Sequence, residues 1–315
     1  MGSLDLPDEP DESGRAEVAR GGGAGRPRTP ELPDPDERGR AYEAARAHVS
    51  AETAQEASPG QRPDETDRRS YWDEAPRFME MRAEQAKCWP GGQRAAVDRS
   101  ADPPGSYRSD GGFYLNPARH AETVRAIGRV REAEPGISAD VQATERDNRY
   151  GGWLEGFGNR LKGEDRLKEK VAERLEGEPD KTPAEILRKV PDAIRYTFCL
   201  RPESYTQGYY AIKDQLESSG YEMYESRNSW NAAEYKGINT RWVAPEGQQF
   251  EVQVHTAESF HAKQFVTHDA YERIRNPLVS DEELAELKTF QREVCSHIQV
   301  PNDARDIPDF KKEGF

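Results

Sequence analysis

The order of strand-like and helix-like segments between Ala193 and His255 restricts the fold more than any other feature of this sequence. Four segments show the alternation or boundaries expected of strands: Ala193–Leu200, Tyr221–Arg227, Gly237–Ala244 and Gln249–His255. A helix is predicted at Glu203–Ser218, and Gly220 is a suitable residue to end it. One strand, a helix and three further strands predict an α/β (α+β) fold, with a mixed sheet of about four to five strands flanked by helices.

Helical patterns also lie on both sides of this central region. The first begins near Asn116, with Pro117 suited to the first helical position and His120, Val124 and Ile127 on one face. Further helices are predicted at Ile137–Asp147, within Asn159–Leu175, and at Thr182–Lys189, Ala257–Arg275 and Asp281–His297. The folded domain is therefore expected to extend over residues 113–300.

Composition separates this domain from the first part of the chain. Residues 1–70 are acidic and rich in Pro and Gly, with Tyr42 as their only aromatic residue, so they are expected to form a disordered tail. Residues 71–112 contain aromatic residues interrupted by turn residues, which predicts a partly ordered lead-in. Residues 301–315 are expected to form a C-terminal tail.

Charge and cysteine content exclude several classes of protein. A formal net charge of −14 argues against a protein that coats nucleic acid or an anionic membrane. The cysteines Cys88, Cys199 and Cys295 lie far apart and form no CxxC pair, so neither a disulfide framework nor a zinc site is expected. Met1–Pro10 lacks the apolar core of a signal peptide, and no apolar run approaches a membrane span. We therefore expect a cytoplasmic protein without a membrane partner.

The last predicted strand carries a set of polar side chains. Side chains alternate across a strand, so Glu251, Gln253 and His255 should point together, away from the apolar residues between them. An acid, an amide and an imidazole on one exposed sheet face could form the floor of a site. The solvent side of an ordinary amphipathic strand would give the same pattern.

Basic residues precede the sheet. Arg160 and Lys162 lie just before Arg166 and Lys170, which are one helical turn apart and share a face. Together they could clamp a polyphosphate. A solvated basic helix face, balanced by neighbouring acids, is the alternative.

Two further motifs lie at the ends of predicted strands. Asp192 stands before an apolar strand, where it could bind Mg²⁺ together with Glu251, although a cap or turn residue would also fit there. Tyr235 and Lys236 precede Gly237, a residue that allows close approach of a ligand and places the Tyr ring as a stacking platform. A plain hairpin turn is the alternative explanation of this second motif.

The order and spacing of these motifs resemble the synthetase domain of the RelA/SpoT family. The resemblance is carried by Arg160-x-Lys162, Asp192-x-x-Arg195, Tyr235–Thr240, Glu251–Thr256 and the helix containing Glu258, Lys263, His268 and Tyr271. It extends over about Gly151–Arg275 and is closer to small toxin-like alarmone synthetases than to the long housekeeping enzymes. The resemblance implies a nucleotidyltransferase-like synthetase fold and an ATP-dependent pyrophosphokinase that uses Mg²⁺.

The resemblance also implies roles for individual residues. Glu251, Gln253 and Asp192 would be catalytic, and Asp192 and Glu251 would hold the metal. The ATP-binding residues would be Arg160, Lys162, Arg166, Lys170 and Arg195. The acceptor-binding residues would be Tyr235, Lys236, Asn239, His255 and Arg227.

Two departures from the family pattern concern the acceptor. Asn239 stands where the housekeeping enzymes usually have His, and His255 stands where they usually have Arg. The acceptor could therefore be GDP or GTP, an adenosine nucleotide, or the 3′ end of a tRNA.

Other functions remain open at this point. A catalytically inactive nucleotide-binding regulatory module and a nucleotidyltransferase are alternatives to the pyrophosphokinase. No hydrolase activity is expected, because His268-Asp269 has no suitably placed upstream His. If the protein inhibits growth, a neutralising partner (an antitoxin) is expected.

Overall fold

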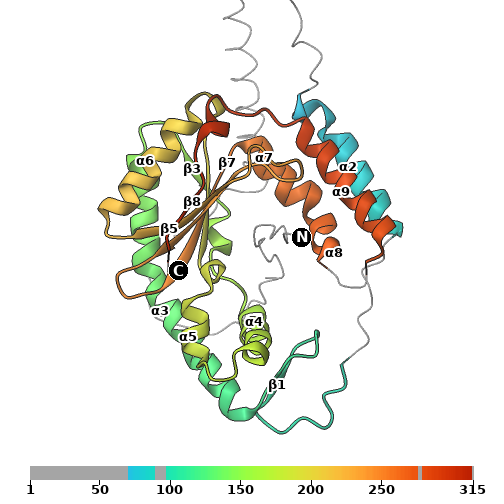
Figure 1. Ribbon diagram of the computed structural model, residues 1–315, viewed down its shortest axis with the longest axis vertical. Coiled ribbons are helices and arrows are strands. Elements are labelled where there is room, and N and C mark those ends of the chain that lie inside the picture. Colours follow the sequence, from blue (N-terminus) through green and yellow to red (C-terminus); the bar gives the residue numbers. More distant parts are fainter. Residues whose placement is uncertain (1–69, 89–96, 276–278, 314–315) are drawn as a thin grey trace, which may run out of the picture. The chain divides into compact units, whose positions relative to one another are not determined.

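A six-stranded mixed β-sheet forms the centre of the computed structural model, which describes residues 70–88, 97–275 and 279–313 (Figure 1). The strands lie in the order β3-β4-β7-β6-β5-β8. Their bounds are β3 Trp153–Glu155, β4 Arg195–Cys199, β5 Glu222–Asn228, β6 Ile238–Val243, β7 Gln249–His255 and β8 Phe310–Lys311. The prediction of a mixed sheet flanked by helices is confirmed, with six strands instead of four to five. The predicted tail at residues 1–70 lies outside the described residues, apart from Ser70.

Parallel pairing occurs between β4 and β7, and the other strand pairs of this sheet are antiparallel. Glu251 of β7 is the register partner of Arg195 on β4 and of Arg241 on β6. Register partners point to the same side of a sheet. The three central strands therefore bring side chains from distant parts of the sequence onto a common face.

One face of the sheet is apolar and forms the main core. Tyr196 and Phe198 of β4 pack there with Phe250, Val252 and Val254 of β7, and all five are buried. Figure 1 shows α3 (Pro117–Asp147) and α6 (Tyr205–Ser218) on one side of the sheet, and α7 (Ala257–His261) and α8 (His268–Ile274) on the other. Burial of these apolar side chains stabilises the fold. Because side chains alternate along a strand, it also fixes the polar side chains of β4 and β7 on the opposite face of the sheet.

A single 31-residue helix, α3, replaces the two helices predicted before residue 147. It begins as expected: the Asn116 side chain accepts a hydrogen bond from the backbone N–H of Arg119 at 2.9 Å, and Pro117 occupies the first turn. The predicted break was wrong because Pro135 lies within the helix, on an exposed side. The predicted inward position of Val124 was also wrong, since this residue is 42% exposed.

The lead-in and the C-terminal segment both add structure that the sequence did not predict. Residues Tyr71–Cys88 form α2, whose Tyr71 and Phe78 are fully buried in the core. A short hairpin follows, made of β1 (Tyr107–Arg108) and β2 (Tyr114–Leu115). At the other end, β8 pairs with β5, and Ile307 is part of the same core.

The remaining helices follow the predicted positions closely. They are α4 Glu164–Gly177, α5 Pro183–Arg188 and α9 Asp281–Ser296, besides α6, α7 and α8. Between α7 and α8 the helix continues as a π-helical turn, η4, at Ala262–Thr267. In the described ranges, no helix combines the length and the apolar character needed to cross a membrane.

Candidate active site

The side of the sheet opposite the main core carries polar residues from three strands. We call this set the polar sheet face: Arg195, Thr197, Asn239, Arg241, Glu251, Gln253 and His255. The sequence predicted an exposed floor here, but Glu251 is only 2% exposed and Gln253 only 1%. The cover comes partly from the helix that follows β7, since Lys263 donates a hydrogen bond to Gln253 Oε1 at 2.5 Å. Glu251, Gln253 and His255 thus share one face, as alternation required, in a buried setting.

An ion cluster of Lys162, Lys170 and Asp192 lies at the start of β4. Lys162 Nζ is 2.5 Å from Asp192 Oδ2, and Lys170 Nζ is 2.9 Å from both carboxylate oxygens. The Asp192 side chain is 1% exposed. Burial acts to raise the pKa of Asp192, but the two lysines outweigh it and hold this pKa below its usual range. The cluster therefore keeps an anion and two cations in one buried place.

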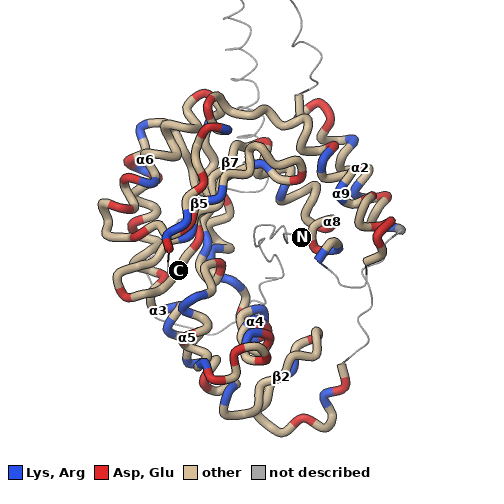
Figure 2. Tube along the Cα trace, in the orientation of Figure 1, with Lys and Arg blue, Asp and Glu red and all other residues tan. Residues whose placement is uncertain are grey.

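Local backbone pairing assembles this cluster. The Lys162 N–H donates to Ala193 O at 3.1 Å, which places the segment before α4 beside the start of β4. Lys170 comes from α4 itself, a helix along which basic and acidic positions are mixed (Figure 2). Three segments separated in sequence thus meet at Asp192.

Glu251 lies one strand away from the ion cluster. Its backbone N–H donates to Ile194 O at 2.9 Å, and its register partner is Arg195. Nη1 of Arg195 is buried, and no hydrogen-bond acceptor reaches it from the described part of the chain. A buried guanidinium N–H without an acceptor is costly, so this atom is suited to an anionic ligand.

The other two predicted clamp residues, Arg160 and Arg166, have carboxylate partners outside the ion cluster. Arg160 Nε is 2.5 Å from Glu134 Oε1 on α3 and also donates to Ser138 Oγ at 3.1 Å. The Arg160 guanidinium also stacks on the Phe157 ring, 4.5 Å from its centroid. Arg166 is 3.3 Å from Glu169 on the surface of α4. Lys162 and Lys170 thus contact Asp192, whereas Arg160 contacts Glu134 and Ser138, and Arg166 contacts Glu169.

A hydrogen-bond chain joins the residues expected to bind the acceptor. Tyr235 OH donates to Asn239 Oδ1 at 2.8 Å and is 3.0 Å from His255 Nε2. His255 Nδ1 is 3.0 Å from Ser259 Oγ at the start of α7. Burial, followed by the charge of Lys263, lowers the pKa of His255 well below its ordinary value, so the ring is neutral. Asn239, Tyr235, His255 and Ser259 are thus linked by successive hydrogen bonds, of which the one from Tyr235 to Asn239 has a fixed direction.

Lys236 and Arg227 differ in their relation to this chain. Lys236 Nζ donates to two carbonyls of its own loop, Trp230 O at 3.2 Å and Ala232 O at 2.6 Å. Burial lowers the pKa of Lys236. Arg227 is the register partner of Asn239, so it lies on the same side of the sheet as the polar sheet face. Lys236 therefore holds the loop together, while Arg227 lies beside Asn239 of the polar sheet face.

A scan against protein-family models found no match, and a search of curated proteins found none either. Solved structures do show similarity. The complex of the type VI effector Tas1 with its immunity protein matches with a TM-score of 0.40 and 16% identity, over 59% of this chain and 97% of the other. A GTP pyrophosphokinase family protein from Streptococcus pneumoniae matches with a TM-score of 0.35 and 14% identity, over 56% and 85%. The small alarmone synthetase 1 from Bacillus subtilis, bound to its product pppGpp, matches with a TM-score of 0.33 and 9% identity, over 54% and 88%.

The fit of a magnesium ion can be judged from the donor groups. No cluster of three or more His, Cys, Asp or Glu side chains suited to a metal occurs among the described residues. Asp192, in the turn before β4, and Glu251, on the neighbouring strand β7, supply two carboxylates, and Mg²⁺ typically takes one or two together with water and phosphate oxygens. These residues therefore fit an ion that a bound nucleotide helps to hold.

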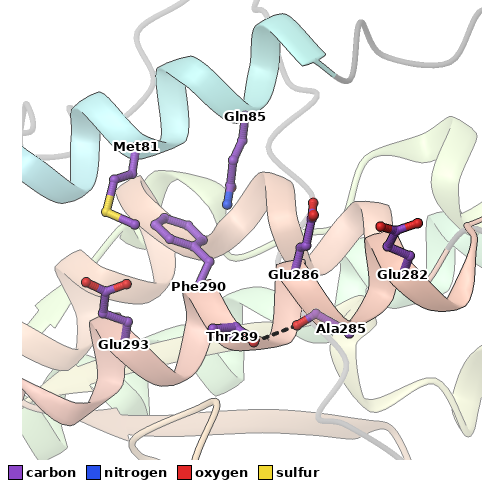
Figure 3. A pocket seen from close by; sticks show the side chains of 8 residues that line it. All are labelled: Met81, Gln85, Glu282, Ala285, Glu286, Thr289, Phe290 and Glu293. Atoms are coloured by element: carbon purple, nitrogen blue, oxygen red, sulfur yellow. Dashed lines mark hydrogen bonds between the residues drawn. The ribbon is translucent and has the colours of Figure 1, made fainter.

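A groove of about 390 Å³ lies elsewhere, between α2 and α9 (Figure 3). Its lining residues are Met81, Gln85, Glu282, Ala285, Glu286, Thr289, Phe290 and Glu293. Three carboxylates would repel the phosphates of a nucleotide. The polar sheet face with the ion cluster is the better candidate for the active site.

Lys263 and Glu134 were not predicted as site residues. In the sequence, Lys263 stands out only as part of the helix that carries the family resemblance, and a regular helical repeat does not place it over Gln253. Glu134 lies in the stretch before Pro135, where a helix break was predicted. A partly buried arginine such as Arg160 requires a carboxylate partner, so the sequence could have predicted that such a partner exists. It does not indicate that the partner is Glu134.

Proposed function

We propose that the protein is a magnesium-dependent pyrophosphokinase that transfers pyrophosphate from ATP to the 3′-hydroxyl of a nucleotide acceptor. The observation that carries this proposal is the buried ion cluster of Asp192, Lys162 and Lys170, adjacent in the sheet to Arg195 and Glu251. Phosphoryl-type transfer depends mainly on positioning and on neutralising charge, and this cluster offers cations and carboxylates for both.

Cationic side chains are assigned to the donor. Lys162 and Lys170 would exchange the Asp192 carboxylate for phosphate oxygens of ATP, and Arg195 would use its buried Nη1 in the same way. Asp192 and Glu251 would hold Mg²⁺, which supplies neutralising charge to the triphosphate when bound. Arg160 would act less directly, since its contacts to Glu134 and Ser138 hold the segment that leads to Lys162.

Glu251 is assigned to the acceptor hydroxyl. The 3′-oxygen attacks the β-phosphorus of ATP, and its proton passes to Glu251. The new bond joins the 3′-oxygen to the β-phosphorus, and the bond between this phosphorus and the α–β bridging oxygen breaks. AMP leaves, and the acceptor carries a 3′-diphosphate. Gln253, whose amide donates to Glu251 Oε1, keeps the carboxylate oriented for this transfer.

The acceptor would bind beside Tyr235, Asn239 and His255. Because Asn239 Oδ1 accepts from Tyr235, the Asn239 Nδ2 group is left to donate to an acceptor atom of the base. Both guanine and adenine offer such atoms, so GDP or GTP and an adenosine nucleotide are the first candidates. Lys236 supports the adjoining loop, and Arg227 is suited to acceptor phosphates. The 3′ end of a tRNA is the further acceptor to be tested.

A product assay tests the proposal. The protein is incubated with Mg²⁺ and ATP radiolabelled in the adenosine, together with GDP, GTP, ADP, ATP or tRNA as acceptor. We expect AMP and a 3′-diphosphorylated product with at least one acceptor. Release of pyrophosphate with transfer of AMP would indicate a nucleotidyltransferase, and ATP binding without any product would indicate an inactive module. Either result would refute the pyrophosphokinase.

Variants link the product to the site. Glu251→Gln should keep the fold and abolish AMP release, and Lys170→Met should reduce it by about two orders of magnitude. Lys168→Met is the matched control, because Lys168 lies on the same helix but pairs with Glu164 at 2.9 Å. Equal losses in the Lys168 and Lys170 variants would contradict the assignment of Lys170 to the donor.

If the activity inhibits growth, a neutralising protein partner is expected. The Tas1 structure is described as a complex with an immunity protein. For this chain, the corresponding test is whether inducing the wild-type protein stops growth while inducing Glu251→Gln does not.

A further inference from the structure

Lys263 is a buried lysine that reaches the centre of the polar sheet face. It is 3% exposed, and its Nζ donates to Gln253 Oε1 at 2.5 Å. Lysine is almost never fully buried unless its charged group is paired or hydrogen-bonded. A neutral or apolar residue would fill this position at a smaller desolvation cost, so the ammonium group needs a specific explanation.

The π-helical turn η4, at Ala262–Thr267, determines where Lys263 points. π-helical turns are rare and occur frequently at functional sites. Within the turn, the Thr267 hydroxyl donates to Ala262 O at 3.1 Å, five residues back. From α2, Arg82 Nη1 donates to Phe265 O at 2.7 Å. Contacts from inside and outside the turn therefore hold this irregular backbone in place.

Hydrogen-bond polarity then fixes the orientation of Gln253. A lysine ammonium only donates, so it requires the oxygen of the Gln253 amide and not its nitrogen. Gln253 Nε2 is then turned to Glu251 and donates to Glu251 Oε1. With the amide reversed, an N–H group would face the ammonium and an oxygen would face the carboxylate, and both contacts would be repulsive.

We infer that Lys263 is a positioning residue for the reaction, an inference that rests on the proposed function. It acts through Gln253 to hold the Glu251 carboxylate in the one orientation that can receive the proton of the acceptor hydroxyl. Its charge also acts on the neighbouring His255, where it helps to lower the pKa of the ring. One lysine thereby links the catalytic carboxylate to the acceptor-binding residues.

Two substitutions separate positioning from a merely structural role. Lys263→Met keeps the length and apolar stem of the side chain but removes the donor, and Lys263→Arg keeps a donor. We expect Lys263→Met to lower kcat by about 100-fold, the loss typical of a slightly misplaced catalytic group, with the KM for ATP within about twofold. Lys263→Arg should recover at least about tenfold of this loss. Lys213→Met is the matched control, since Lys213 pairs on the surface of α6 with Glu217, and kcat should not change.

A second measurement reports the contact without any turnover. The side-chain amide protons of Gln253, assigned by their loss in Gln253→Leu, are followed by NMR hydrogen exchange. We expect slow exchange in the wild type and in Lys213→Met, and faster exchange in Lys263→Met. A folded Lys263→Met protein with unchanged kcat, or with unchanged exchange, would overturn the inference. So would a Lys263→Arg protein that is no more active than Lys263→Met.

The two proposals fail in different ways. If the wild type releases no AMP with any acceptor, the pyrophosphokinase is refuted and Lys263 positions no catalytic group for it. If the wild type is active and the Lys263→Met protein matches it, the pyrophosphokinase stands and only the role of Lys263 is refuted.

Discussion

Replacing Gly237 with alanine should create a collision that the surrounding structure cannot relieve. Gly237 has a φ of 153°, which L-residues rarely adopt. A Cβ built there would lie 2.8 Å from Cε1 and 2.9 Å from Nδ1 of His255, and 3.2 Å from Val254 O. His255 is fully buried, and its two nitrogens contact Tyr235 and Ser259. The ring can give way only by breaking at least one of these contacts.

The expected magnitude has two parts. The unfavourable φ should reduce the free energy of unfolding by about 1–3 kcal/mol. Displacement of the His255 ring would leave a buried polar group without its partner, which should reduce the free energy of unfolding further, by about 1–3 kcal/mol. The sum is about 2–6 kcal/mol, a large fraction of the stability of an ordinary domain.

Two glycines serve as matched controls. Gly247 also has a positive φ, 89°, but the nearest atom to a new Cβ is Arg188 Cδ at 3.4 Å, the flexible part of a side chain. Gly247→Ala should therefore show the backbone part alone, about 1–3 kcal/mol. Gly128 lies within α3 with no atom within 4 Å of a new Cβ, so Gly128→Ala should raise stability by about 0.5–1 kcal/mol.

Urea unfolding of the three variants and a double-mutant cycle with His255→Ala measure these terms. Because His255→Ala removes the ring that the new Cβ would strike, the combined variant should be more stable than additivity predicts, by at least about 1 kcal/mol. A coupling energy below about 0.5 kcal/mol, or a Gly237→Ala loss no larger than that of Gly247→Ala, would refute the steric argument.

Three further predictions concern other parts of the fold. Asp192→Asn leaves the buried Lys162 without its counter-charge and should destabilise the protein by about 3 kcal/mol at pH 7 in urea unfolding. Because the folded pKa of Asp192 lies below its ordinary 3.8, the wild-type advantage should be constant above about pH 5 and shrink as the pH falls below that value. Tyr235→Phe removes the hydroxyl between Asn239 and His255 and should lower the free energy of unfolding by about 1–3 kcal/mol; no change would contradict a stabilising role of these two hydrogen bonds. Pro135→Ala should raise the thermal midpoint, because it restores a helix donor at an exposed position of α3, and a lower midpoint would show that the proline is needed there.

The parts of the fold that the sequence predicted well depend on local patterns. The alternation of Phe250, Val252 and Val254 with Glu251 and Gln253 identifies β7 and its two faces without knowledge of its neighbours. The same holds for Asn116 and Pro117 at the start of α3, where the cap and the first turn are adjacent in sequence. Side-chain periodicity and helix caps involve residues that are close in sequence, so the sequence alone predicts the elements that depend on them.

Features that depend on distant partners were missed. Nothing in Tyr71–Cys88 indicates that Tyr71 OH lies 2.7 Å from His261 Nδ1, although this contact helps to dock α2. The strand β8 has only two residues and exists because β5 offers it an edge. Arg160 contacts Glu134 and Ser138 of α3, and the second contact is possible because the helix continues through Pro135.

The burial of the polar sheet face depends both on a local sequence pattern and on a contact from a later segment of the chain. Alternation assigned Glu251 and Gln253 to one side of β7, but it does not distinguish a face that contacts solvent from one that another element covers. The cover arises only ten residues after Gln253, where the π-helical turn brings Lys263 back over the strand. The buried carboxylate of Glu251, the amide of Gln253 and the ammonium group of Lys263 each need the hydrogen bond of the next group. The irregular turn and the polar strand are therefore stable only together. If Lys263→Met unfolded the turn without altering Gln253, this mutual dependence would be wrong, and the polar face would have to be held by its neighbouring strands alone.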